Sequence, residues 1–123
     1  MTKPSRYPYA ETIVRLTQAI VDAGNRIFAT IDQSKAAQEA GLALRPTTLI
    51  LFGNPKGGTP LMEAYPLFAL DLPLKLLVWE EDGRCKVAFV PASEIAARYG
   101  ITGMDRIVSA MDAALRALID SVA

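Results

Sequence analysis

A predicted hairpin in the second half of the chain constrains the fold more than any other feature. Leu74–Glu80 is an apolar run typical of a strand, and Arg84–Val90 alternates apolar and charged residues. Between them, Asp82-Gly83 is a strong signal for a two-residue hairpin turn. The two runs are therefore predicted to pair antiparallel. One face of the second run carries Cys85, Val87 and Phe89.

Two further strands and two helices are expected before this hairpin. Helical spacing of apolar residues predicts a helix over Glu11–Ala23, and Asp32 is a good N-cap for a short helix through Ala40. Thr47–Phe52 is β-branched and apolar, as in a buried strand. Arg26–Ile31 is predicted as a short strand. Its inward face is expected to carry Ile27, Ala29 and Ile31.

Three helices are expected in the rest of the chain. Thr59-Pro60 has the N-cap and N1 pattern of a helix start, and Ser93 is placed to cap a helix to Tyr99. The last helix begins near Gly103, where Thr102 and Asp105 resemble a capping pair. Its apolar seam consists of Met104, Val108, Met111, Leu115, Leu118 and Val122. We expect this seam to cover a sheet, although a coiled-coil contact has the same spacing. The element order predicts an α+β fold with helices packed on an antiparallel sheet.

Length and charge limit the function classes. The 123 residues are predicted to form a single domain, residues 1–123. Lys+Arg and Asp+Glu are both 13 with no basic block, so nucleic acid and an anionic membrane surface are not expected partners. The chain is 51% hydrophobic, which favours a homodimer interface; a high alanine content is the alternative explanation.

The chain has one cysteine and no histidine. A Ser-His-Asp or Cys-His catalytic arrangement is therefore excluded, and no metal site or cofactor is expected. Cys85 alternates with apolar residues and is predicted to be a small core residue. Without a membrane-length apolar run or an N-terminal apolar segment, we expect the protein in the cytoplasm.

A Gly-rich loop after the Thr47–Phe52 strand is the strongest candidate site. The loop runs into a helix start, where free backbone N–H groups and the helix dipole attract anions. Turn chemistry alone also accounts for the glycines, the prolines and the asparagine. The predicted ligand-binding residues are Asn54, Lys56, Gly57, Gly58 and Thr59, with Lys75 as a possible second positive charge.

Four motifs resemble the domain of unknown function 302 family. The sharpest is the Gly-Asn-Pro-Lys-Gly-Gly-Thr-Pro run at residues 53–60. The others are Leu44-Arg45-Pro46-Thr47, Asp71-Leu72-Pro73-Leu74-Lys75 and Ile95-Ala96-Ala97-Arg98-Tyr99-Gly100.

The resemblance implies a curved antiparallel sheet in a TATA-binding-protein-like β-α-β(4)-α arrangement, often as a homodimer, with no established activity. It also implies a further strand near Lys3–Ala10, which the prolines restrict to an edge. Where family members commonly have Ile-Asp-His, this chain has Ile31-Asp32-Gln33. Any histidine chemistry of such relatives is therefore not expected here.

Three functions remain open at this point. The first is a non-catalytic homodimeric binding module for a small anionic ligand or a protein partner. The second is a histidine-independent enzyme that uses a buried carboxylate, for which Asp71 and Glu80 are candidates, or a tyrosine. The third is a purely structural or assembly role. We favour binding and assembly over catalysis, because the sequence contains no visible nucleophile–base pair or ligand cluster.

Overall fold

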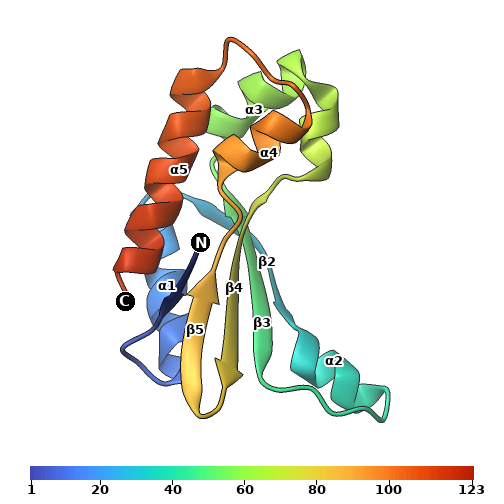
Figure 1. The fold of residues 1–123 in the computed structure, drawn as a ribbon, viewed down its shortest axis with the longest axis vertical. Helices are drawn as coiled ribbons and strands as arrows, with labels where there is room; N and C mark the ends of the chain where they lie inside the picture. Colours follow the sequence, from blue (N-terminus) through green and yellow to red (C-terminus); the bar gives the residue numbers. More distant parts are fainter.

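The computed structural model describes residues 1–123 as an antiparallel sheet with helices against one face and at one end (Figure 1). In chain order the elements are β1 (Thr2–Pro4), α1 (Tyr9–Asp22), β2 (Arg26–Asp32), α2 (Gln33–Glu39), β3 (Thr47–Gly53), α3 (Pro55–Ala64), the 3₁₀ helix η1 (Pro66–Leu70), β4 (Leu74–Glu81), β5 (Arg84–Ala88), α4 (Ala92–Arg98) and α5 (Asp105–Asp120). The predicted α+β class, with helices packed on an antiparallel sheet, is confirmed.

The five strands form one sheet in the order β1-β5-β4-β3-β2, and every neighbouring pair is antiparallel. The predicted hairpin joins β4 to β5. Asp82 and Gly83 have φ values of 52° and 75°, the left-handed values that a two-residue type I′ turn requires. At the β5 edge, Thr2–Pro4 forms the additional strand that the family resemblance implied. Its proline is tolerated because edge strands need no complete ladder.

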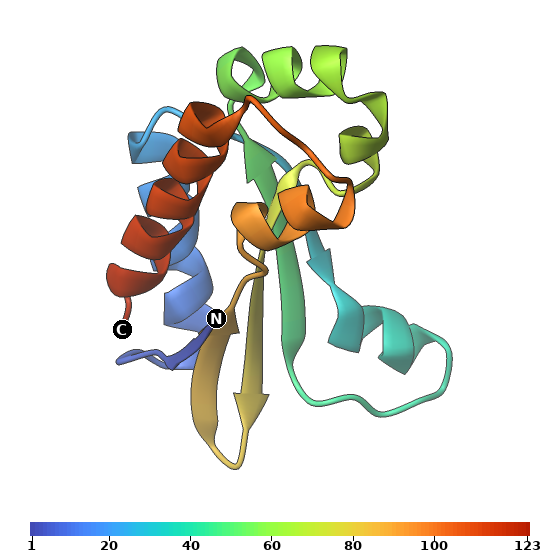
Figure 2. The ribbon, with the colours of Figure 1, turned by 45° about the horizontal axis from the view of Figure 1, so that its top comes forward.

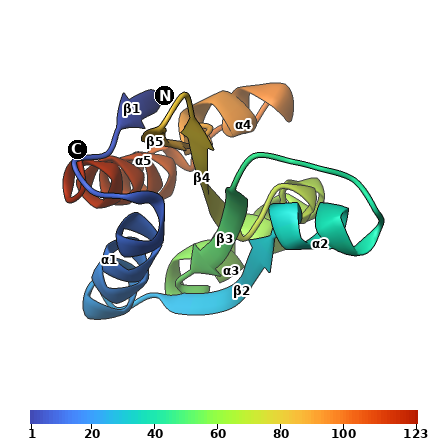
Figure 3. The same ribbon diagram turned by 90° about the horizontal axis from the view of Figure 1, so that it is seen from below.

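One face of the sheet is closed by α1 and α5, which lie side by side against it (Figure 3). Fourteen buried residues join there into one core, which we call the sheet cluster: Leu16, Ile20, Ile50, Phe52, Leu74, Leu76, Val78, Cys85, Val87, Phe89, Leu115, Leu118, Ile119 and Val122. The seam residues Leu115, Leu118 and Val122 of α5 therefore cover the sheet, as predicted, whereas Met104 and Val108 pack with residues of α3 and α4 at the end of the sheet. Cys85, Val87 and Phe89 share this face, also as predicted.

The expected face of β2 is wrong because the strand contains a β-bulge. The register against β3 shifts between Ile27 and Ala29, leaving Phe28 as the extra residue. Ile27 therefore packs on the sheet cluster, whereas Ala29 and Ile31 lie opposite Leu51 and Leu49 on the other face. The extra residue of a bulge changes the face on which every later side chain of the strand is expected to lie. A prediction from simple alternation does not detect this change.

The second face of the sheet is largely apolar, with Lys75 and Lys86 as charged residues on it, and is only partly covered. We call it the open face, and define it by Ile31, Leu49, Leu51, Leu77 and Trp79. Leu49 lies directly between Ile31 and Leu77 across three neighbouring strands. All five side chains retain solvent exposure, whereas the alternating residues of β3 and of β4 as far as Val78 are buried.

The helix α2 and the loop after it project from this side of the sheet (Figure 3). Asp32 caps α2 as predicted, because its Oδ1 accepts from the Lys35 amide at 2.9 Å. No residue from position 33 to 45 is buried, and Leu42 in the following loop is 68% exposed. This segment, which we call the arm, therefore has almost no hydrophobic support from its own chain.

A second hydrophobic cluster lies at the end of the sheet where α3, η1 and α4 gather beside α5 (Figure 2). This cap cluster consists of Leu61, Phe68, Ala92, Ile95, Ala96 and Val108. The expected capping by Ser93 is wrong: α4 begins at Ala92, and the Asp112 carboxylate on α5 accepts from the Ala92 amide at 2.6 Å. A carboxylate 20 positions away in the chain thus satisfies the helix start.

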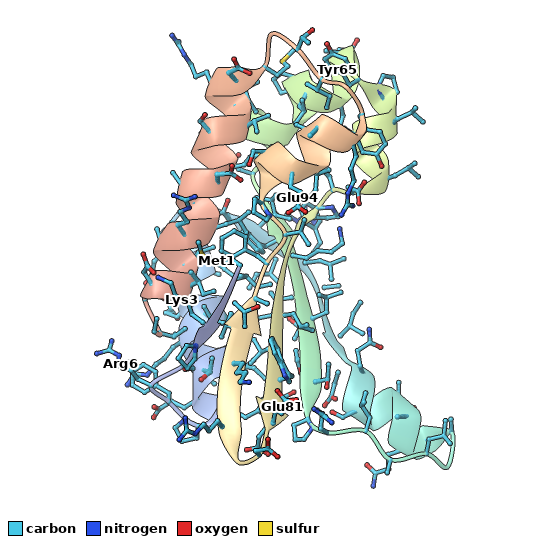
Figure 4. All side chains as sticks on the ribbon, viewed as in Figure 1. Met1, Lys3, Arg6, Tyr65, Glu81 and Glu94 are labelled. Atoms are coloured by element: carbon cyan, nitrogen blue, oxygen red, sulfur yellow. The ribbon has the colours of Figure 1, made fainter.

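The capping pair expected for α5 is also absent. The N-cap position is Met104, with no side-chain hydrogen bond. The Thr102 carbonyl instead accepts from the Tyr65 hydroxyl at 2.9 Å, which ties the α4–α5 loop to the end of α3 (Figure 4). Tyr65 also accepts from the Thr102 amide at 3.1 Å, so this contact holds the loop before α5 and leaves the helix without a side-chain cap.

Candidate functional site

The Gly-rich loop forms the first turn of α3. The helix begins at Pro55, five residues earlier than the Pro60 start expected from sequence, and Pro60 lies inside it. Asn54 is the N-cap, and proline is favoured at the first helical position because it has no N–H to leave unpaired. Both Asn54-Pro55 and Thr59-Pro60 consist of a favoured N-cap residue followed by proline, and the helix begins at the first of the two.

The amides at this helix start are already paired. Asn54 Oδ1 accepts from the Lys56 amide at 3.0 Å, and the Asn54 carbonyl accepts from the amides of Gly57 and Gly58 at 2.9 and 3.0 Å. These donors therefore stabilise the turn itself. An anion here would have to compete with bonds that the chain makes to itself.

A cavity of about 520 Å³ lies beside this turn, between the start of α3, the start of β4 and the α5 helix. Phe28 closes one side of the cavity. An edge atom of its ring lies 3.7 Å from the position that a Cβ atom would occupy on Gly53. Its wall is largely apolar and includes Met62, Leu72, Ile107, Ala110 and Met111. Leu72 and Met111 contact both the sheet cluster and the cap cluster, so the cavity lies at their junction.

The structure separates the six residues predicted to bind a ligand into two groups. Asn54, Gly57 and Gly58 line the cavity; Lys56 and Thr59 are exposed residues outside its wall. Lys75 also lies outside it. Its Nζ donates to the carbonyls of Asp71 at 3.1 Å and Pro73 at 2.9 Å, so its charge supports the turn before β4. Ligand binding by these six residues stays a prediction.

Sequence reasoning missed the α5 side of the cavity. Arg106, Ile107, Ala110 and Ala114 line it together with Met111. Their spacing of three to four residues is a second helical stripe, next to the seam that covers the sheet. That stripe was visible in the sequence. Its closeness to α3 was not, because it depends on how α5 crosses the end of the sheet.

A polar cluster borders the cap cluster. The Tyr99 hydroxyl donates a short hydrogen bond to Asp71, and Arg98 Nη1 lies 3.8 Å from the other carboxylate oxygen. The bond to Asp71 and partial burial raise the pKa of Tyr99, so its hydroxyl stays protonated at neutral pH. Asp71 and Glu80 are both partly exposed. The buried carboxylate that the enzyme alternative requires is therefore not formed by either residue.

Cys85 lies in the sheet cluster and is 6% exposed. Burial raises the pKa of its thiol, so little thiolate forms at neutral pH. The prediction that Cys85 is a small core residue is confirmed. No group of three or more His, Cys, Asp or Glu side chains is gathered in a way that could hold a metal ion.

The model of the family described as "Domain of unknown function DUF302" matches residues 1–122 of this chain. The chain belongs to the DUF302 family. The resemblance drawn from four sequence motifs is thereby confirmed over almost the full length. Gln33, which replaces the histidine common in the family, is an exposed residue of α2, at the opposite end of the sheet from α3 and the cavity (Figure 1).

The crystal structure of an uncharacterized conserved DUF302 protein from Bacillus stearothermophilus has the same fold. The two structures superpose with a TM-score of 0.93, covering 100% of this chain and 97% of the other. Sequence identity is 22%, so the likeness concerns the fold.

Curated relatives include proteins named fluoride-specific ion channel FluC. FluC 1 of Brucella suis and FluC 1 of Brucella abortus are each 46% identical to this DUF302 chain over 87 residues. The match covers 71% of this chain and 34% and 32% of those proteins, so the chain spans about a third of their length. No helix in this DUF302 chain has the length and apolar character needed to cross a membrane.

Proposed function

We propose that this DUF302 domain is a non-catalytic binding module that holds a small anionic ligand in the cavity between α3 and α5. The cavity is the observation that carries the proposal: ligand sites are concave, largely apolar and a few hundred Å³ in volume, with a small number of polar groups. Asn54, Gly57 and Gly58 contribute its α3 side. We place the module in the cytoplasm, because a single unpaired cysteine suits a reducing compartment.

Fluoride is the anion that the named relatives suggest testing first. A bare halide needs several convergent donors, and the amides at the start of α3 are paired within the chain. The cavity of about 520 Å³ is also far larger than one halide ion. We therefore expect an organic anion to bind more tightly than fluoride.

The test is a thermal-shift screen with fluoride, phosphate, sulfate, nucleotides and carboxylates. A ligand at 100 times its Kd stabilises the folded state by about 2.7 kcal/mol, which raises the melting temperature by several degrees. The screen compares the wild type with Ala110→Trp, which fills the cavity from α5, and with Ala113→Trp, an exposed control outside its wall. Lys56→Ala tests the sequence-based site. If no compound raises the melting temperature of the wild type more than that of Ala110→Trp, the proposed binding function is wrong.

The module is also proposed to act as a homodimer through the open face. Four strands paired over about six residues present roughly 400 Å², given strand spacings near 4.8 Å and a rise of 3.3 Å per residue. A stable interface needs about 800 Å² from each partner. The arm, with exposed Leu42 and Leu44 and no buried residue, is able to supply the rest by packing on the second copy.

Charges at the border of the open face suit self-association. Glu81 accepts from Arg45 at 2.9 Å and from Lys86 at 3.0 Å, near the hairpin end labelled in Figure 4. One carboxylate thus offsets part of the charge of two positive side chains, which reduces the repulsion between two identical faces.

Sedimentation velocity tests this interface at micromolar concentration. We expect a dimer for the wild type and a monomer for Ile31→Lys, which introduces a charge into the open face; Val14→Lys on α1 is the exposed control. A wild-type monomer would contradict the dimer. In that case a FluC protein of the named relatives is the first other partner to test, because a segment similar to this chain forms part of its length.

A further inference from the structure

We propose that the cavity selects a monocarboxylate with an unbranched apolar tail, and that Arg106 pairs with its carboxylate. This inference rests on the proposed binding function and names its ligand class. The tail would occupy the apolar region between Met62, Leu72 and Met111. The carboxylate would lie at the α5 start, where the wall is positive.

Arg106 is the one ionisable residue among the 17 that line the cavity. The other polar side chains are those of Asn25 and Asn54, and Asn54 Oδ1 is occupied by the Lys56 amide. Arg106 takes part in none of the five ion pairs of the chain, so no carboxylate of the protein neutralises it. A single unpaired guanidinium on an apolar wall favours one negative charge and binds a carboxylate through two parallel hydrogen bonds.

The start of α5 reinforces this charge. Arg106 is the second residue of a 16-residue helix, and no side chain caps the amides of the first turn. The positive end of the helix dipole therefore adds to the guanidinium, and the carboxylate of Asp105, the first residue of the helix, offsets part of this positive charge. The starts of the two helices differ in this respect, because Asn54 caps α3.

The size and polarity of the cavity determine the tail. At about 30 Å³ for each water-sized atom, 520 Å³ holds roughly 17 heavy atoms, so carboxylates of eight to ten carbons, with about ten to twelve heavy atoms, fit inside it. Because the wall offers few other polar partners, hydroxyl groups on the tail would lose hydrogen bonds with water and gain none. Sugars, nucleotides and polycarboxylates are therefore disfavoured.

Isothermal titration with decanoate, octanoate, butanoate, decanol and decylammonium tests the ligand class below micelle-forming concentrations. We expect affinity to rise about 15-fold from octanoate to decanoate, because each buried methylene contributes about 0.8 kcal/mol. Decanoate should bind at least ten-fold more tightly than decanol, which corresponds to about 1.4 kcal/mol. Decylammonium should not bind measurably. Equal binding of decanoate and decanol would overturn the proposal.

Arg106→Gln isolates the charge. It should weaken decanoate at least ten-fold and change decanol less than two-fold, whereas Arg106→Lys should restore part of the loss. Arg116→Gln, on the same helix and outside the cavity, is the matched control and should leave both ligands unchanged. If Arg106→Gln leaves decanoate binding unchanged, the assignment of Arg106 is wrong.

The same titrations distinguish failure of the ligand class from failure of the proposed function. If decanoate and decanol bind equally and Ala110→Trp abolishes both, the cavity is a binding site and the carboxylate preference is wrong. If decanoate binds wild type and Ala110→Trp equally, it binds elsewhere, and both the ligand class and the cavity lose their support.

Discussion

The two hydrophobic clusters of this protein are built in different ways. The sheet cluster joins residues from Leu16 to Val122, so the two ends of the chain close around it. The cap cluster has six buried residues, which come from short elements and the first turn of α5. A cavity persists where a large core meets a small one, because neither cluster has the side chains to fill the junction. Leu72 and Met111 contact both and mark that junction.

The largest expected effect comes from truncating one aromatic residue in each cluster. Phe52→Ala and Phe68→Ala both remove a fully buried ring, which costs about 3–5 kcal/mol. We expect Phe52→Ala to destabilise the whole fold and to speed labelling of the Cys85 thiol. Phe68→Ala should speed hydrogen exchange in α3, η1 and α4 and leave Cys85 labelling slow. Similar labelling rates in both variants would show that the clusters unfold as one unit.

A smaller effect is expected at the contact that joins α4 to α5. Asp112→Ala removes the acceptor of the Ala92 amide and leaves a helix start without a cap, which costs about 1–2 kcal/mol. Urea unfolding measures the loss, and Asp112→Asn should retain part of the stability. If Asp112→Ala also speeds amide exchange throughout the sheet cluster, the effect of Asp112 is not confined to the cap cluster, and this expectation is wrong.

A gain in stability is expected at the start of α3. Gly57 is helical, and a Cβ there would meet no atom within 4 Å. Gly57→Ala should therefore stabilise the fold by about 0.5–1 kcal/mol, through a smaller loss of backbone entropy on folding. Thermal unfolding measures this gain. Because Gly57 lines the cavity, the same variant should bind ligand no better than the wild type.

The smallest effect is expected in acid, at the border of the open face. Hydrogen bonds and charges of Lys86 and Arg45 hold the pKa of Glu81 below its ordinary value. A carboxylate with a lowered folded pKa contributes stability above its ordinary pKa of about 4.3 and loses it as the pH falls through the folded value. Because these groups are exposed, the effect is slight and salt-sensitive. Glu81→Gln should lack this acid-dependent loss, as measured by urea unfolding from pH 5 to pH 2.

The sequence predicted those elements whose pattern is local. The Asp82-Gly83 turn, the Asp32 cap and the α5 seam are each specified by neighbouring residues, and all three are confirmed. The caps of α4 and α5 were predicted wrongly: Asp112 reaches the start of α4 from a distant position, and Thr102 is bonded to Tyr65 instead of capping α5. Capping by tertiary contact leaves no local pattern.

The candidate site was predicted only in part, because it also depends on contacts between residues that are distant in the sequence. The α3 turn was visible as a run of Gly, Asn and Pro, and three of its residues line the cavity. Arg106 was not singled out, because its importance depends on the cavity beside it rather than on any motif. A charged side chain becomes a candidate for ligand binding when the residues around it are apolar, and the fold determines which residues surround it.

The bulge at Phe28 links the edge strand to both proposed binding surfaces. If β2 ran through Phe28 without the bulge, Phe28 would lie opposite Leu51, and Ala29 and Ile31 would turn toward α1. The cavity would then lose a wall, and the open face would lose its outermost apolar side chain. A change that straightened this bulge without removing a residue would thus exchange the two sides of the edge strand beyond Ile27, and with them what each side can bind.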